Sequence, residues 1–171
     1  EDVERCCAMA KDVGVVEPAN YNCPGQVVIS GTAKAVNKAC EYAKDMGAKR
    51  AIPLAVSAPF HCSLLEPAAF KLKEQLDKLH IEAPDIPVIS NVNAEPIVES
   101  RQIRDLLTKQ VTHSVRWQES IEYMIKEGID TFIELGPGRT LINFLKRIDR
   151  NVTGYNVEDL QTLEKTLKEL G

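Results

Sequence analysis

The sequence predicts an α/β protein built in two parts. In residues 1–57 the expected elements run helix, strand, strand, helix, strand, and in residues 58–171 short apolar strands alternate with amphipathic helices. The chain has 171 residues, of which 44% are hydrophobic, so it holds enough apolar material for one proper core. We therefore expect a layered domain with a mainly parallel sheet, joined to a smaller subdomain.

The first part has the element order of a ferredoxin-like unit. Its helix, two strands, helix and strand are expected over residues 2–12, 15–22, 26–30, 31–47 and 49–57. The two middle strands flank the sequence NCPG, in which Pro24 and Gly25 supply the backbone angles of a tight turn. This order is that of a β-α-β-β-α-β unit whose first strand is missing.

The second part alternates helices and strands. Helices are expected over residues 64–79, 100–110, 115–127, 139–149 and 158–170. Strands are expected over residues 86–90, 130–138 and 151–157. A polar loop follows the first of these strands, and the second ends in a Gly-Pro-Gly turn that opens directly into a helix. The amide groups of such a helix N-terminus offer a place for an anion.

Composition and charge exclude several kinds of partner. The formal charge is -4 and no block of basic residues interleaves with aromatics, so nucleic acid is not an expected partner. No apolar run approaches the roughly 20 residues that cross a bilayer, and the first ten residues, EDVERCCAMA, are charged. We expect no membrane segment, no signal peptide and a cytoplasmic location.

The cysteines and histidines do not form a metal-binding pattern. The five cysteines are scattered without a C-x-x-C pair, as expected of free thiols in a reducing cytosol, and they are Cys6, Cys7, Cys23, Cys40 and Cys62. The three histidines are far apart in the sequence, at His61, His80 and His113. We therefore expect no metal ion.

His61 is the candidate for catalysis, because it follows an apolar run and precedes an expected helix. An imidazole is the usual general base for a serine or cysteine nucleophile, while the alternative is a packed histidine bonded to a backbone carbonyl. The nearest hydroxyl and thiol groups, those of Ser57, Cys62 and Ser63, are too close along the chain to face the ring. No G-x-S-x-G turn occurs, so the residues alone show a base without a nucleophile.

Five segments together resemble one known family. They are NYNCPGQVVISG (20–31), VSAPFHCSLLEPAA (56–69), IPVISNVNA (86–94), VRWQESIEYM (115–124) and ELGPGRTL (134–141). In this order and at this spacing they are similar to the C-terminal part of the malonyl-CoA:acyl-carrier-protein transacylase family. The resemblance implies an α/β-hydrolase-like acyltransferase domain, here residues 58–171, and a ferredoxin-like small subdomain, here residues 1–57.

The resemblance also implies a reaction. A serine takes a malonyl group from malonyl-CoA and passes it to the phosphopantetheine thiol of acyl carrier protein in fatty-acid synthesis, with no further cofactor. His61 matches the family's base, and the backbone carbonyl of Gln110 matches the group that orients it. The serine, a glutamine of the oxyanion hole and the arginine that binds the malonyl carboxylate belong to the N-terminal part of the family. Arg116 and Arg139 stand at the wrong positions for that arginine.

The same resemblance suggests the substrate-binding residues. Phe60, immediately before the base, matches the residue that narrows the acyl pocket in malonyl-selective relatives; the alternative is packing under the next helix. Asn20, Asn22 and Gln26 match positions facing the cleft, although Asn22 alone is a common turn residue. Asn91 matches a loop beside the histidine.

Acyl carrier protein is acidic, so basic side chains of the small subdomain are candidates for steering it, unless they are only a solvated face; they are Lys34, Lys38, Lys44, Lys49 and Arg50. Two alternatives stay open for the function. One is a non-catalytic module that binds a ligand or partner, with a structural His61. The other is an acyltransferase segment of a polyketide-type synthase.

Overall fold

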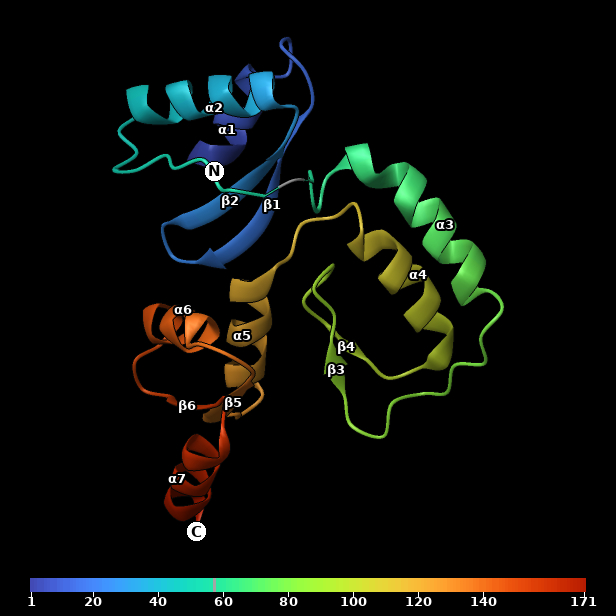
Figure 1. The fold of residues 1–171 in the computed structure, drawn as a ribbon, viewed down its shortest axis with the longest axis vertical. Coiled ribbons are helices and arrows are strands. Elements are labelled where there is room, and N and C mark those ends of the chain that lie inside the picture. Colours follow the sequence, from blue (N-terminus) through green and yellow to red (C-terminus); the bar gives the residue numbers. More distant parts are fainter. Residues whose placement is uncertain (57) are drawn as a thin grey trace.

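The structure is a computed structural model that describes residues 1–56 and 58–171 (Figure 1). Ser57, the last residue of the strand expected over residues 49–57, lies outside the described residues. The helices are α1 (Asp2–Met9), α2 (Ala33–Asp45), α3 (Glu66–Leu76), α4 (Ser100–Gln110), α5 (Trp117–Lys126), α6 (Thr140–Ile148) and α7 (Leu160–Leu170). The strands are β1 (Val16–Cys23), β2 (Gln26–Gly31), β3 (Val88–Ile89), β4 (Pro96–Ile97), β5 (Thr131–Leu135) and β6 (Thr153–Val157), and a single 3-10 turn, η1 (Ser63–Leu65), leads into α3.

The first part is a hairpin covered by two helices. Strands β1 and β2 pair antiparallel, and α1 and α2 lie side by side over the hairpin (Figure 1). Their shared core consists mostly of small side chains, namely Cys7, Ala10, Val16, Ala35 and Ala39. Small side chains allow close approach of the two helices and the strand. The hairpin and both helices predicted for this part are confirmed.

The strand predicted over residues 49–57 is wrong for its described residues, which are irregular. A strand is stabilised by hydrogen bonds to a neighbouring strand, and among the residues that the structure describes none pairs with this segment. Its apolar side chains are accordingly exposed, with Ile52 at 66%, Leu54 at 58% and Val56 at 62%. The first part therefore shows the helix, hairpin and helix of the expected ferredoxin-like unit without its closing strand.

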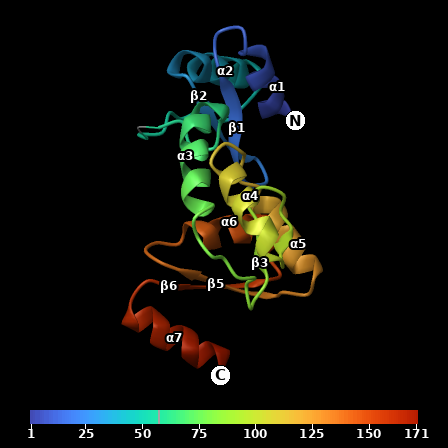
Figure 2. The ribbon, with the colours of Figure 1, turned by 90° about the vertical axis from the view of Figure 1, so that its right-hand side faces the viewer.

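The middle of the chain holds two helices and a small hairpin. Helices α3 and α4 pack side by side, as both Figure 1 and Figure 2 show. Strand β3 pairs antiparallel with β4, which lies where the sequence predicts only a polar loop. The turn between these strands is closed by the amide of Ser90, which donates to the carbonyl of Glu95 at 2.9 Å. A ladder of two residue pairs is too short to give a periodic signal.

The C-terminal part is built on the parallel pair of β5 and β6 (Figure 2). Helices α5 and α6 share a second core around Ile121, Ile142 and Leu145, while α7 packs against β6. The prediction of a mainly parallel sheet is correct for this pair alone. In the described part of the chain, the strands form three separate two-stranded ladders, two of which are antiparallel.

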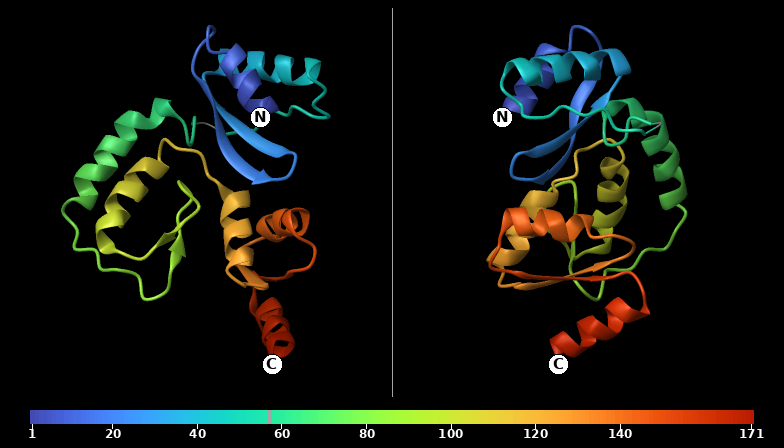
Figure 3. Two further views of the ribbon diagram at one scale, coloured as in Figure 1. Left: turned by 180° about the vertical axis from the view of Figure 1, so that it is seen from behind. Right: turned by 60° about the vertical axis from the view of Figure 1, so that its left-hand side comes forward.

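Strand β1 also contacts the segment that follows α4. The amide of Val115 donates to the carbonyl of Ala19 at 2.8 Å, and the amide of Tyr21 donates back to the carbonyl of Val115 at 2.9 Å. The hydroxyl of Ser114 donates to the carbonyl of Pro18 at 2.6 Å. The two backbone bonds form a short parallel bridge. Through it the hairpin contacts the segment between α4 and α5 (Figure 3).

None of the helices that the structure describes is long and apolar enough to cross a membrane.

Candidate active site

His61 lies in the turn that precedes η1 and α3, and its side chain is half-buried. Its backbone has a φ of 58°, in the left-handed region that residues with a side chain seldom occupy. The next residue, Cys62, is fully buried, and its thiol donates to the carbonyl of Pro59 at 3.3 Å. The turn is thus fixed by a buried side chain while the imidazole beside it remains partly accessible.

The imidazole of His61 contacts the end of α4. Its Nδ1 lies 2.9 Å from the carbonyl oxygen of Gln110. A carbonyl oxygen only accepts hydrogen bonds, so the proton of the neutral ring sits on Nδ1 and the lone pair sits on Nε2. This is the tautomer that a general base acting through Nε2 needs.

The position of Gln110 explains why its carbonyl is available. It is the last residue of α4, where the final carbonyls have no partner within the helix. The neighbouring carbonyls of Thr108 and Lys109 accept from backbone amides of residues 111–113, whereas that of Gln110 accepts from His61. The negative end of the helix dipole also lies here.

The side chain of Gln110 reaches Asn91. The Asn91 amide donates to the Gln110 side-chain oxygen at 3.4 Å, and the Asn91 carbonyl accepts from the backbone amide of Arg116 at 2.9 Å. Both residues that the resemblance assigns to the surroundings of His61 are therefore joined to one another. Asn91 is linked to the ring through Gln110.

Phe60 lies mostly at the surface of the described chain. Phe60 is 54% exposed, which is more than expected of a residue buried beneath a helix. The ring is therefore not part of either core of the described chain. Its role in selecting the acyl group stays a prediction.

The three predicted cleft residues lie on the β1–β2 hairpin. Asn20 and Asn22 are on β1 and Gln26 is the first residue of β2, and no hydrogen bond within the described residues joins them to the imidazole. The Gln26 side-chain oxygen accepts from Arg147 of α6 at 2.6 Å. Gln26 therefore joins the hairpin to α6 in this structure.

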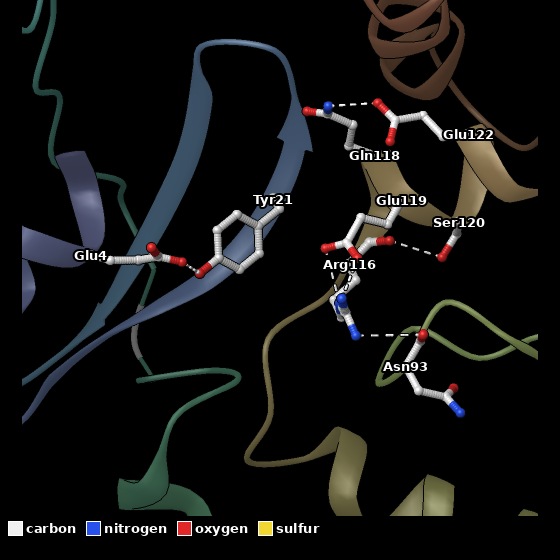
Figure 4. A network of polar contacts seen from close by, with 8 residues as sticks. All are labelled: Glu4, Tyr21, Asn93, Arg116, Gln118, Glu119, Ser120 and Glu122. Carbon is white, nitrogen blue, oxygen red and sulfur yellow. Dashed lines mark hydrogen bonds and ion pairs between the residues drawn. The ribbon is translucent and has the colours of Figure 1, made fainter. Parts of the chain in front are cut away.

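Arg116 is held by other parts of the protein, as Figure 4 shows. Its guanidinium pairs with the carboxylate of Glu119 and also donates to the carbonyl of Asn93 at 3.5 Å. The bond to Glu119 raises the pKa of Arg116 above its usual value. Nearby, the Tyr21 hydroxyl donates to Glu4 at 2.7 Å and ties β1 to α1 (Figure 4). The arginine is thus held by protein groups in this structure.

The Gly-Pro-Gly turn does not present an empty anion site. The carboxylate of Glu134 accepts from the amides of Leu141 at 3.1 Å and Ile142 at 2.9 Å. The carboxylate of Glu158 accepts from the amide of Gly138 at 2.8 Å. Protein carboxylates therefore already satisfy the N-terminus of α6.

The cysteines of the described residues are unpaired thiols. All five cysteines are free, and no group of three potential ligands could hold a metal ion in this part of the chain. Burial raises the pKa of the Cys7 thiol to about 11, which keeps it protonated near neutral pH.

One contact beside His61 has no counterpart in the sequence patterns. Glu17, on β1, accepts two hydrogen bonds from Ser63, the first residue of η1. The two residues are 46 positions apart, and neither stands in a pattern that would pair them.

Comparisons with known proteins bear on this arrangement. The malonyl CoA-acyl carrier protein transacylase of Bacillus subtilis is 50% identical over 164 residues, which are 94% of this chain and 52% of the relative. The crystal structure of the Clostridium perfringens protein of the same name is 51% identical, with a TM-score of 0.95 over 98% of this chain and 53% of that one. The chain is homologous to the C-terminal part of these transacylases.

Two further findings complete the comparison. A malonyl-transacylase in complex with a type II PKS acyl-carrier protein is 39% identical, with a TM-score of 0.95 over 98% of this chain and 54% of that chain. No family model matches the chain. The chain spans about half the length of the transacylases that it matches.

Proposed function

We propose that this chain is part of an acyltransferase that moves a malonyl group from malonyl-CoA to the phosphopantetheine thiol of acyl carrier protein in fatty-acid synthesis. The single observation that carries the proposal is the 2.9 Å contact between His61 Nδ1 and the Gln110 carbonyl, because it puts the lone pair that can act as a base on Nε2. The names of the relatives, which are malonyl CoA-acyl carrier protein transacylases, support the choice of substrates.

In the proposed reaction, a serine outside this chain is the nucleophile. His61 Nε2 takes the proton of the serine hydroxyl while the serine oxygen attacks the malonyl thioester carbonyl. The bond to sulfur then breaks, and the departing coenzyme A thiolate receives the proton from Nε2. Transfer to the carrier runs through the same steps in reverse, with the phosphopantetheine thiol giving its proton to Nε2.

The remaining site assignments belong to the same proposal. Phe60 lies against the acyl group and Asn91 stabilises the loop beside the base, while Asn20, Asn22 and Gln26 form part of the cleft wall. The proposal needs no metal or further cofactor. The five free thiols support a reducing compartment such as the cytoplasm.

Docking of the acidic carrier protein would use the basic side chains of the small subdomain. Lys34 and Lys38 line a shallow hollow beside α2 together with Val13, Asn37 and Glu41. Lys38 is also paired with Glu41 at 2.9 Å, so part of its charge is already compensated. Lys34 is the better candidate of the two.

The test is the intact mass of the protein after exposure to malonyl-CoA. It compares the 171-residue chain with the same chain extended at its N-terminus to the length of its relatives, here called the extended protein. We expect a malonyl adduct on the extended protein alone, and its loss in His61→Ala. An adduct on the 171-residue chain would indicate an internal nucleophile, and no adduct on either protein would favour a binding module.

A further inference from the structure

Glu17 forms a two-pronged contact with the segment that carries His61. One carboxylate oxygen accepts from the backbone amide of Ser63 at 2.8 Å, and the other accepts from the Ser63 hydroxyl at 2.9 Å. Both residues are partly buried. Hydrogen bonds to a carboxylate are stronger than those between neutral groups, so this contact fixes the chain two residues after the base.

The backbone of His61 needs such support. Its φ of 58° is a conformation that costs about 1 to 3 kcal/mol for a residue with a side chain and persists only when the surroundings hold it. Within the described residues, the ring is held by the Gln110 carbonyl and the following chain is held by Glu17 through Ser63.

The two residues of β1 that follow Glu17 contact the segment just after Gln110, the hydrogen-bond partner of His61. Directly after Glu17, the carbonyls of Pro18 and Ala19 accept from Ser114 at 2.6 Å and from Val115 at 2.8 Å. These two donors lie just beyond the end of α4, whose last carbonyl contacts His61. Three consecutive residues of one strand therefore hold both segments that supply the histidine and its carbonyl partner.

We propose that Glu17 is a positioning residue that keeps the His61 imidazole in register with the Gln110 carbonyl. It acts through Ser63, while β1 fixes the α4 end of the same contact. The importance of this register for acyl transfer rests on the proposed function. The register itself is a property of the described chain, so it can be measured without any reaction. If Glu17 only stabilised the fold, its substitution would lower the free energy of unfolding without changing which ring nitrogen of His61 carries the proton.

The experiment is nitrogen NMR of the histidine rings in the 171-residue chain at a pH where the rings are neutral. The ¹⁵N shifts of Nδ1 and Nε2 report which nitrogen carries the proton. In the unchanged protein we expect His61 to hold its proton on Nδ1. In Glu17→Ala we expect a mixture of both tautomers, and in Glu17→Gln, whose amide can still bond to Ser63, we expect the Nδ1 form to return.

Two controls separate positioning from general loosening of the fold. Glu41→Ala removes an exposed carboxylate of the same subdomain that pairs with Lys38, and it should leave the His61 signals unchanged. His80 and His113 report from exposed sites in every variant. Circular dichroism verifies that each variant is folded.

A Glu17→Ala protein that keeps the single Nδ1 tautomer, while its melting temperature falls, would overturn the proposal. Should Glu17→Ala not fold, Glu17→Val decides, because valine removes both bonds to Ser63 and favours the strand conformation of β1. An unchanged ring in that variant would equally overturn the proposal.

The extended protein provides a second readout. There, Glu17→Ala should lower kcat by about a hundredfold with little change in KM, as expected when a reacting group is misplaced by about 1 Å. If the unchanged extended protein has no transferase activity, the proposed function fails, and the NMR result still decides the role of Glu17.

Discussion

At the scale of single residues, Phe60 is the side chain most open to a test of selectivity. It precedes the base and is 54% exposed, so a substitution there alters a surface and not the core. We expect Phe60→Ser in the extended protein to raise the ratio of kcat/KM for methylmalonyl-CoA over malonyl-CoA by about tenfold or more, since one methyl group in a pocket is worth about 1 to 3 kcal/mol. Phe70→Ser, an equally apolar and exposed position on α3, is the control. An equal change in both variants would contradict the assignment.

Cys7 gives a prediction about pH and stability. Burial is the main cause that raises its pKa from 9.0 to about 11 in the folded protein, followed by the neighbouring Cys6 and Cys40. The unfolded chain therefore releases the proton first, and the free energy of unfolding falls as the pH rises from 9.0 to about 11. Below pH 9.0 the thiol is protonated in both the folded and the unfolded protein, so it does not make the free energy of unfolding depend on pH.

Urea denaturation at a series of alkaline pH values measures this slope. Cys7→Ala should be less stable at every pH, because a buried side chain is lost, but its stability should fall less steeply above pH 9.0. Cys62→Ala, which removes a buried thiol that is not among the causes of the Cys7 shift, is the control. Parallel slopes in Cys7→Ala and the unchanged protein would contradict the prediction.

At the scale of elements, Gly31 is the residue on which the β1–β2 hairpin most depends. It ends β2 with a φ of 158°, and a Cβ there would lie 2.1 Å from the carbonyl oxygen of Val15. That carbonyl also accepts from the amide of Thr32 at 2.8 Å, so it cannot move away without losing a bond. We expect Gly31→Ala to lower the free energy of unfolding by about 3 kcal/mol.

Gly47→Ala is the matched control. Gly47 also has a positive φ, of 89°, but a Cβ added there would meet no atom within 4 Å. The loss there should be limited to backbone strain of about 1 kcal/mol. Thermal unfolding of both variants compares them, and equal losses would show that the contact with Val15 is not what requires glycine at position 31.

The same elements show what the sequence can reveal. The helices and the hairpin were predictable because their signals are local: apolar residues at helical spacing, and a Pro-Gly turn between two short strands. The segment 49–57 carries an equally strong local signal, yet its described residues form no strand, because a strand also needs a neighbour. Strand β4 was missed for the opposite reason. It has a neighbour, β3, but its two residues are too few to show the alternation of a strand in the sequence.

At the scale of the whole molecule, the candidate site depends on contacts between distant parts of the chain. The sequence identified His61 as a candidate by its chemistry, but only the resemblance to a family pointed to Gln110, which lies 49 positions away. Neither source pointed to Glu17. A hydrogen bond between residues far apart leaves no periodic trace, so such partners become visible only when the fold is known.

In the proposed reaction, His61 acts as a base oriented by a backbone carbonyl. The most direct measurement is the single-turnover rate of malonyl transfer to acyl carrier protein by the extended protein and two variants. We expect His61→Ala to be slower by about a factor of 10² to 10⁴, as for loss of a general base. Gln110→Ala keeps the carbonyl and loses only the side-chain bond to Asn91, so it should retain at least about a tenth of the rate. Equal losses in the two variants, or an undiminished rate in His61→Ala, would contradict the account.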